Sequence, residues 1–378
     1  MQVVRGSMRA RRLITRFFAV LIICCLVVVA LEGMVRLVRP QLYFSTCVNQ
    51  WDKDVGTKLI PGINGFLRCP EYSVNAIINS KGLRDREFTY EKPANTRRII
   101  CLGDSFTFGY GVQEKKTFSK LLEQFMNEGP VDGNRWEVLN AGIGSTGTAN
   151  QLALLETECY KYSPDIVVVC FCPANDFFDN ITCGLYSLEG GALVKHPAPR
   201  TGARVAQGFV RFIPAYGTLC AKSHLVNLVR YRVTALHYRV LNRRATKSMK
   251  HETLVVMHNE LTYALVDALH RACVERGSEL VVMFIPPPQV GESARWTGDL
   301  IGHCEKQGIP SLDLTACFAT ARENGMQTAY RNEGHWNENG HAIAARALHD
   351  FLLQRGAISD RSGAGRRPEG EVSSKPDE

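Results

Sequence analysis

The sequence lacks several patterns that mark common catalytic and metal-binding sites. It contains no C-x-x-C pair among its 13 cysteines and no G-x-S-x-G segment. The first absence leaves no zinc-ligand spacing and no redox motif, and the cysteines outside the apolar N-terminal segment are odd in number. We therefore predict no metal site and no full disulfide framework, with a single Cys47–Cys69 bridge as an open alternative. The second absence argues against the nucleophile turn of an α/β-hydrolase.

Acidic residues are scarce in two stretches of the chain. Residues 1–40 contain seven arginines and one glutamate, and residues 184–250 contain twelve lysines or arginines and one glutamate. Because the whole chain has a formal net charge of only +8, the remaining residues are acidic overall. The basic charge thus lies in two separate pieces, which argues against a nucleic-acid partner.

Charge of either sign is absent from residues 17–31. With their apolar neighbours, residues 13–38 form a segment long enough to span a bilayer. Five arginines precede the uncharged residues 17–31, so we predict that the basic residues 1–12 stay in the cytoplasm and that the rest of the chain crosses the inner membrane. A cleaved signal peptide is the alternative, because Ala30 ends a weak small-residue site. Both interpretations place the bulk of the chain on the periplasmic or other extracytoplasmic side.

Three further segments surround the main domain. Residues 41–95 predict a small β-rich preface that either covers the first strand of the domain or lines a substrate groove. Residues 223–244, in the basic insertion 184–250, predict a helix that begins after Ser223 and carries an apolar stripe beside its arginines. The favoured interpretation packs that stripe on the domain; a lid, or a helix on anionic lipid headgroups, is the alternative. Residues 356–378 are predicted to be disordered.

The rest of the chain alternates apolar strands with helical segments. Strands are predicted at 98–102, 136–140, 165–171, 279–285 and 309–314, and helices begin near 117 and 148 and span 252–276 and 338–354. This alternation predicts an α/β domain over 97–355, with a five-stranded parallel sheet covered by helices. If strands one and three are neighbours, the strand order is the flavodoxin-like 2-1-3-4-5.

Chemically useful side chains follow the carboxyl ends of several predicted strands. Because these ends share one edge of a parallel sheet, we expect the side chains to lie close together. A histidine at this edge fits a general base for a serine nucleophile, and an amide and a backbone N–H fit oxyanion donors. The residues concerned are Asp104, Ser105, Gly142, Asn175, Asp176 and His335.

Residues 142–147 also match the G-x-G-x-x-G pattern of dinucleotide sites. Two observations count against that interpretation. The motif follows the second strand rather than the first, and Asp165 begins the next strand although the acid of a dinucleotide site ends it. We therefore predict no organic cofactor here and interpret the glycines as allowing a close approach of the backbone.

The ordered set of residues resembles the SGNH, or GDSL-type, hydrolases over about residues 97–354, with Asn79–Asp85 similar to membrane-anchored bacterial members. The four marker residues are Ser105, Gly142, Asn175 and His335. The resemblance implies a three-layer α/β/α domain in which Ser105 is the acyl nucleophile and His335 its base. It implies an oxyanion hole from the N–H groups of Ser105 and Gly142 and the Asn175 amide.

The sequence departs from the family pattern at two positions. Pro173 stands where the third block carries glycine, and Asn332 stands where the last block carries the aspartate that precedes the histidine by three residues. The acid that orients the histidine is therefore open. We favour Glu333, which has the charge and the reach, over Asn332, which has no charge, and Asp313, which ends the fifth strand.

The resemblance implies a membrane-tethered serine esterase that removes an acyl group, such as O-acetyl, from envelope glycan or lipid without a metal or organic cofactor. Two alternatives stay open at this point. The same residues suit an O-acyltransferase that acts on envelope polysaccharide, and a site without activity would suit a glycan-binding or assembly protein. Product analysis with a sugar acceptor separates the first alternative from hydrolysis, and turnover of a simple ester excludes the second.

Overall fold

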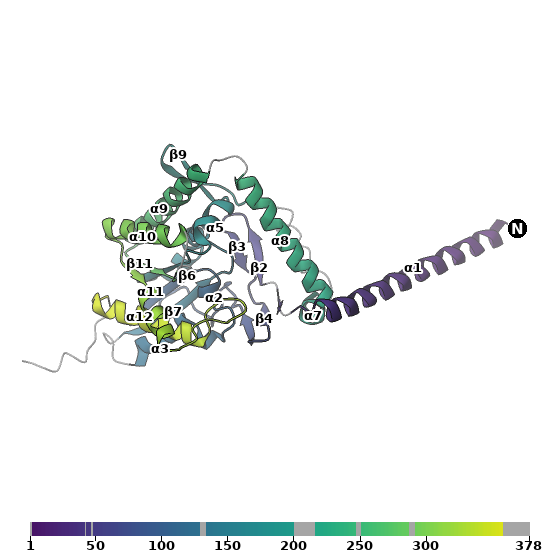
Figure 1. Ribbon diagram of the computed structural model, residues 1–378, viewed down its shortest axis with the longest axis horizontal. Helices are drawn as coiled ribbons and strands as arrows, with labels where there is room; N and C mark the ends of the chain where they lie inside the picture. The colour runs from purple at the N-terminus through teal and green to yellow at the C-terminus, as the bar shows by residue number, and fades with distance from the viewer. Residues whose placement is uncertain are drawn as a thin grey trace, which may run out of the picture.

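The computed structural model describes residues 2–41, 43–46, 48–128, 134–199, 216–246, 251–286 and 292–357. It begins with a long helix, α1 (Gln2–Val38), that projects from one side of the domain (Figure 1). Its apolar part, Leu13–Val38, has 26 residues and is almost entirely exposed. At 1.5 Å per residue this part is about 39 Å long, which exceeds the ~30 Å hydrocarbon core of a bilayer. The helix is therefore long and apolar enough to cross a membrane.

A five-stranded parallel sheet forms the centre of the domain. The strands are β6 (Thr96–Gly103), β7 (Arg135–Gly142), β8 (Ile166–Phe171), β11 (Glu279–Phe284) and β12 (Ser311–Asp313). Their order is β12-β11-β8-β6-β7, and every neighbouring pair is parallel. In chain order this is 2-1-3-4-5, so the predicted sheet is confirmed. Each observed strand begins and ends within two residues of its predicted bounds.

Helices cover both faces of this sheet. One face packs against α4 (Thr148–Thr157), α9 (His251–Glu275) and α10 (Glu292–Lys306), and the other against α3 (Phe118–Glu128), α11 (Thr315–Glu323) and α12 (Glu338–Gln354). Successive residues of a strand point to opposite faces. In β6, Ile100 and Leu102 therefore join the first core, and Ile99 and Cys101 join the second.

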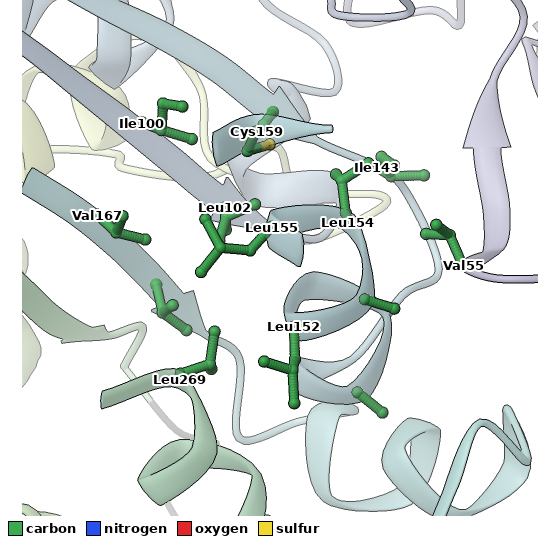
Figure 2. Close-up of a cluster of buried hydrophobic side chains, with 14 of the residues drawn as sticks. Val55, Ile100, Leu102, Ile143, Leu152, Leu154, Leu155, Cys159, Val167 and Leu269 are labelled. Atoms are coloured by element: carbon green, nitrogen blue, oxygen red, sulfur yellow. The ribbon is translucent and has the colours of Figure 1, made fainter. Parts of the chain in front are cut away.

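The first core shows how the carboxyl edge of the sheet is supported. Figure 2 shows Ile100, Leu102 and Val167 of the sheet facing Leu152 of α4 and Leu269 of α9. All five side chains are buried. Burying side chains of this size contributes about 1.5–3 kcal/mol each. The two strands that lead to the candidate nucleophile and to the candidate amide, β6 and β8, are thus held by the same core.

The preface consists of short antiparallel strands that pack against the carboxyl edge of the sheet. It contains β1 (Phe44–Ser45), β2 (Asn49–Asp52), β3 (Gly56–Leu59), β4 (Asn64–Arg68) and β5 (Ser73–Ile77). The Asn49 side chain donates to the Gly144 carbonyl at 3.3 Å, and the Asn150 side chain donates to the Val55 carbonyl at 2.7 Å. The sequence left open whether the preface covers a strand or borders a groove. The structure sets it against the loop after β7.

The segment Asn79–Asp85 braces the turn that carries the candidate nucleophile. Arg84 is fully buried, and its guanidinium donates to the carbonyls of Phe108, Gly109 and Val112 at 2.6–2.7 Å. The Asn79 side chain accepts the N–H of Leu83 at 2.9 Å, which fixes the turn before the arginine. The charged guanidinium group thus satisfies carbonyls at and just beyond the end of the short helix that follows β6.

The short helix α5 (Asp176–Thr182) precedes the insertion. The insertion contains a hairpin of β9 (Tyr186–Glu189) and β10 (Ala192–Lys195), followed by α7 (Tyr216–Lys222) and α8 (His224–Thr246). Two 3₁₀ turns, Glu114–Lys116 and Cys159–Tyr162, lie elsewhere in the domain. Ser223 caps α8, because its hydroxyl accepts the Val226 N–H at 3.1 Å. The prediction that the stripe of α8 packs on the domain is wrong. Asn227 bonds α8 to α7 and Arg230 bonds it to the preface. Of the five stripe residues Val226 is half-buried, and the other four are exposed: Val229, Val233, Leu236 and Val240.

Two sequence predictions fall largely outside the described residues. Cys47, one half of the alternative disulfide, is not among them, and Cys69 is a buried free thiol. The described chain ends at Ala357, so residues 358–378 of the predicted disordered tail also lie outside it.

Candidate active site

Ser105 stands at the turn from β6 into the short helix α2 (Ser105–Phe108). Asp104 caps this helix, because its Oδ1 accepts the Phe106 N–H at 2.8 Å. The turn needs Gly103, since a Cβ there would collide with the Thr107 side chain. As the first residue of a helix, Ser105 has an N–H without an acceptor inside the helix. The turn therefore presents both the Ser105 hydroxyl and a backbone donor at the carboxyl edge of the sheet.

His335 faces Ser105 from the loop before α12. Its Nε2 lies 2.8 Å from the Ser105 Oγ. Tyr330 holds the loop from both sides, because its N–H donates to the His335 carbonyl at 2.9 Å and its hydroxyl donates to the Gly111 carbonyl at 2.8 Å. The Tyr110 ring stacks on the imidazole, with centroids 5.1 Å apart. This geometry suits transfer of a proton from serine to histidine.

Glu333 is the acid that the structure brings to the histidine. Its Oε1 lies 3.8 Å from the His335 Nδ1, which is too long for a hydrogen bond but close enough for a strong interaction between charges. Asn332 is exposed, and its backbone N–H donates to the Glu71 carboxylate at 3.1 Å. Asp313 caps α11, because it accepts the Thr315 N–H at 2.8 Å. The geometry thus pairs Glu333 with His335 and gives Asp313 a structural role.

Two preface residues that the sequence analysis did not single out contact the loop that carries Glu333. Glu71 accepts the N–H groups of Arg331 and Asn332 at 2.9 and 3.1 Å. Tyr72 forms a side-chain hydrogen bond with Glu333, and burial together with this bond raises the pKa of Tyr72. The Glu333 carboxylate is therefore held by a phenol that stays protonated near neutral pH. Both contacts join parts of the chain that are far apart in sequence.

Buried carboxyl groups lie behind the nucleophile. Asp104 and Asp176 are both buried, and the Asp176 carboxylate accepts the Cys172 N–H at 3.2 Å. Burial raises the pKa of Asp104 to about 6. Burial and the nearby charge of Asp104 raise the pKa of Asp176 well above its ordinary value. Two close, buried carboxyl groups disfavour double ionisation, so the pair holds a proton at mildly acidic pH.

Asn175 lies at the predicted edge and its amide is already oriented. It follows β8, the neighbour of β6, and it precedes the first residue of α5. Its Nδ2 donates to the Asp179 carboxylate at 3.0 Å and to the Asp176 carboxylate at 3.2 Å. Burial raises the pKa of Asp179. The amide therefore points its donors at acids behind the site, and binding an oxyanion requires one of these bonds to be exchanged.

Gly142 ends β7 beside Gly103, at the predicted edge of the sheet. Its N–H donates to the Asn140 side chain at 3.0 Å, so this donor is already occupied. A Cβ at Gly142 would collide with the backbone of Phe108, so the glycine is required for packing β7 against α2. The loop beyond it holds an unexpected feature, because Ser145 is exposed and has a φ of 62°. Serine rarely adopts this left-handed conformation.

A family model described as GDSL-like Lipase/Acylhydrolase matches residues 99–348. The chain belongs to this family. The match covers the sheet, Ser105 and His335, and it makes the protein a carboxylic ester hydrolase, as the resemblance of the motifs implied. A search of curated proteins found no match.

Several solved structures are similar to this chain over about two thirds of its length. A lipolytic protein of the G-D-S-L family from Desulfitobacterium hafniense is 12% identical with a TM-score of 0.38, over 68% of this chain and 99% of that one. An acetyl-xylooligosaccharide esterase from Geobacillus is 11% identical with a TM-score of 0.39, over 70% and 96%. A two-domain esterase active on acetylated mannans is 12% identical with a TM-score of 0.39, over 68% of this chain and 49% of that one.

Proposed function

We propose that this GDSL-family protein is an exported serine esterase, tethered to the inner membrane by residues 13–38, that removes short acyl groups such as O-acetyl from envelope glycan or lipid. The observation that carries the proposal is the contact between Ser105 Oγ and His335 Nε2 at 2.8 Å, with the Glu333 carboxylate on the far side of the ring. A hydroxyl, an imidazole and a carboxylate in this order form the arrangement of serine acyl-transfer enzymes.

The proposed reaction has two steps. The Ser105 hydroxyl attacks the ester carbonyl while His335 takes its proton, and the protonated His335 then gives that proton to the leaving alcohol. Water, deprotonated by the same imidazole, hydrolyses the acyl-serine and releases the acid. The Glu333 carboxylate stabilises the imidazolium that exists between these proton transfers.

The developing oxyanion needs donors at the carboxyl edge of the sheet. The Ser105 N–H and the Asn175 amide are the proposed donors, and each can lower the barrier by about 3 kcal/mol. The Gly142 N–H is the third proposed donor, and like the Asn175 amide it must exchange a bond, here the one to the Asn140 side chain, in order to serve. A backbone donor from the loop around Ser145, which has a φ of 62°, is the alternative.

The location of the substrate follows from the anchor. The arginines before residue 13 favour a cytoplasmic N-terminus, so the domain that follows α1 lies outside the cytoplasm. Acylated glycans and lipids of the envelope are the esters within reach of a domain held there. A phosphatase reporter fused to the C-terminus should be active, and the protein should resist extraction from membranes by salt. Recovery of a soluble form that begins near Leu31 would instead support signal cleavage.

The activity is tested with the purified, detergent-solubilised full chain and p-nitrophenyl acetate. Release of acetate and nitrophenol is expected, with faster turnover of acetyl than of octanoyl esters. The variants Ser105→Ala and His335→Ala should each lose at least about 10³-fold in kcat. Adding an oligosaccharide acceptor should leave free acetate as the main product. If acetylated sugar were the main product, the site would be a transferase; if no variant changed turnover, the proposed site would be wrong.

A further inference from the structure

α8 presents an apolar stripe that the rest of the described chain leaves uncovered. Val229, Val233, Leu236 and Val240 follow one another at intervals of four, three and four residues, so they share one face of the helix. All four are exposed, and Leu236 keeps 61% of its accessible surface. A contiguous exposed apolar face on a soluble domain marks a surface that meets another partner.

The start of α8 is fixed to the end of α1. The Glu32 carboxylate accepts the Ser223 hydroxyl at 2.8 Å and the N–H groups of His224 and Leu225 at 2.9 Å. Arg36 donates to the Lys222 carbonyl at 2.9 Å. A carboxylate satisfies the free N–H groups of a helix N-terminus and complements its dipole. The apolar anchor helix and α8 are therefore joined by defined polar contacts as well as by the chain.

α8 lies on the side of the domain from which α1 projects. Figure 1 shows it running from α7, next to the base of α1, along the domain beside β2 and β3. The inward side of α8 is tied to the preface, because Arg230 donates to the Ser45 carbonyl at 2.7 Å and to the Ser45 hydroxyl at 2.8 Å. The side chains of the stripe stay exposed beside this contact. A bilayer crossed by α1 would lie on the same side of the domain as α8.

The charge of α8 identifies the kind of surface that it fits. Its sequence contains five arginines and no acidic residue, and Arg232 is exposed beside the stripe. We propose that α8 lies on the anionic bilayer that α1 spans, with the stripe inserted at the level of the lipid headgroups. Apolar side chains flanked by basic ones bind such interfaces, and each basic residue adds attraction to anionic lipid. This inference rests on the membrane anchoring in the proposed function.

The arrangement has a consequence for the ester hydrolase. The preface lies between α8 and the active-site loops, through Arg230 on one side and Asn49 on the other. Holding α8 on the bilayer therefore holds the preface, and the site behind it, at a fixed height above the membrane. Substrates attached to the membrane or lying against it would be within reach, and those farther away would not.

The test uses photo-crosslinking of the full chain in bilayer discs made from equal parts of phosphatidylcholine and phosphatidylglycerol. A benzophenone-bearing amino acid is placed at position 233 in the stripe. Position 274 is the matched control, because Val274 is exposed to a similar extent but lies at the end of α9, at the amino edge of the sheet. Position 21 in α1 reports on the anchor. Hydrolysis of p-nitrophenyl acetate by each labelled protein reports on folding.

The proposal predicts lipid adducts at positions 21 and 233, with a yield at 233 at least about tenfold above that at 274. Adducts at 21 with only background at 233 would overturn the role of α8 and leave the anchor intact. Background at both positions would overturn the anchor and this inference together, while ester hydrolysis would still stand or fall separately. Crosslinks from 233 to a second copy of the chain would show a self-association face instead. Equal yields in pure phosphatidylcholine would overturn the preference for anionic lipid.

Discussion

The substitution Glu333→Gln tests the electrostatic role of the acid beside His335. It keeps the size of the side chain and removes its charge, so the hydrogen bond from Tyr72 can still be accepted. The carboxylate lies 3.8 Å from the His335 Nδ1. The Glu333 side chain is 13% exposed to solvent and the His335 side chain 23%. At an effective dielectric constant of 20, a unit charge at this distance stabilises the imidazolium by about 4 kcal/mol. Screening by solvent at the partly exposed edge reduces this to about 2–3 kcal/mol.

Since about 1.4 kcal/mol corresponds to a tenfold change in rate, kcat should fall by about 10²-fold. The imidazolium forms only during the reaction, so KM should change by less than about threefold. Steady-state kinetics on p-nitrophenyl acetate measure both values. Asn332→Ala is the matched control in the same loop and should keep kcat within about threefold, because the contact of Asn332 with Glu71 uses its backbone. A larger loss in Asn332→Ala than in Glu333→Gln would refute the assignment.

Three further predictions concern the support of the site and the stability of the fold. Asp179→Ala should leave the Asn175 amide held only by Asp176, so that its orientation as an oxyanion donor is lost, and should lower kcat about tenfold with little change in KM, measured by the same kinetics. Arg84→Met removes the guanidinium donor of three buried carbonyls, of which the Gly109 carbonyl keeps the Val112 N–H, and should lower the free energy of unfolding by about 3 kcal/mol, measured by urea unfolding. Burial lowers the pKa of His341 from 6.5 to about 3. Between these two pH values His341 is protonated in the unfolded chain but not in the folded one. The free energy of unfolding therefore decreases as the pH falls below 6.5, by about 1.4 kcal/mol per pH unit. His341→Gln should remove this part of the slope between pH 6 and pH 4, and an unchanged slope would contradict the shift.

The sheet could be predicted because its strands are short, apolar on both faces and separated by helical patterns. Residues 166–171 are a run of apolar side chains that only a strand buried on both faces explains, and all six are buried. The bounds of α12 match the prediction, because Asn337 caps its start and Gly356 follows its end in a left-handed conformation. The spacing of apolar residues correctly predicted the helix α8 but not the surroundings of its apolar stripe. A stripe at helical spacing predicts a helix, but the spacing does not indicate what covers the stripe.

The candidate nucleophile and base could be predicted because Ser105 follows the carboxyl end of β6 and His335 lies in the loop before α12, and the parallel topology brings both to one edge of the sheet. The contact between Ser105 and His335 crosses 230 positions of sequence. Gly142 shows what the sequence pattern cannot distinguish. A glycine needed for packing against α2 occurs in the same pattern as a glycine needed for binding an oxyanion. Tyr72 and Arg84 were missed for a related reason. Their roles depend on how the preface folds onto the domain, and short irregular strands carry no signal for that.

The central claim is that Ser105 is the covalent nucleophile of a carboxylic ester hydrolase. A fluorophosphonate reacts with an activated serine and leaves a stable adduct that peptide mass spectrometry can locate. With the full chain in detergent, the account predicts one adduct, on the peptide that contains Ser105, and its loss in both Ser105→Ala and His335→Ala. An adduct on another serine, or labelling that persists in Ser105→Ala, would contradict the account.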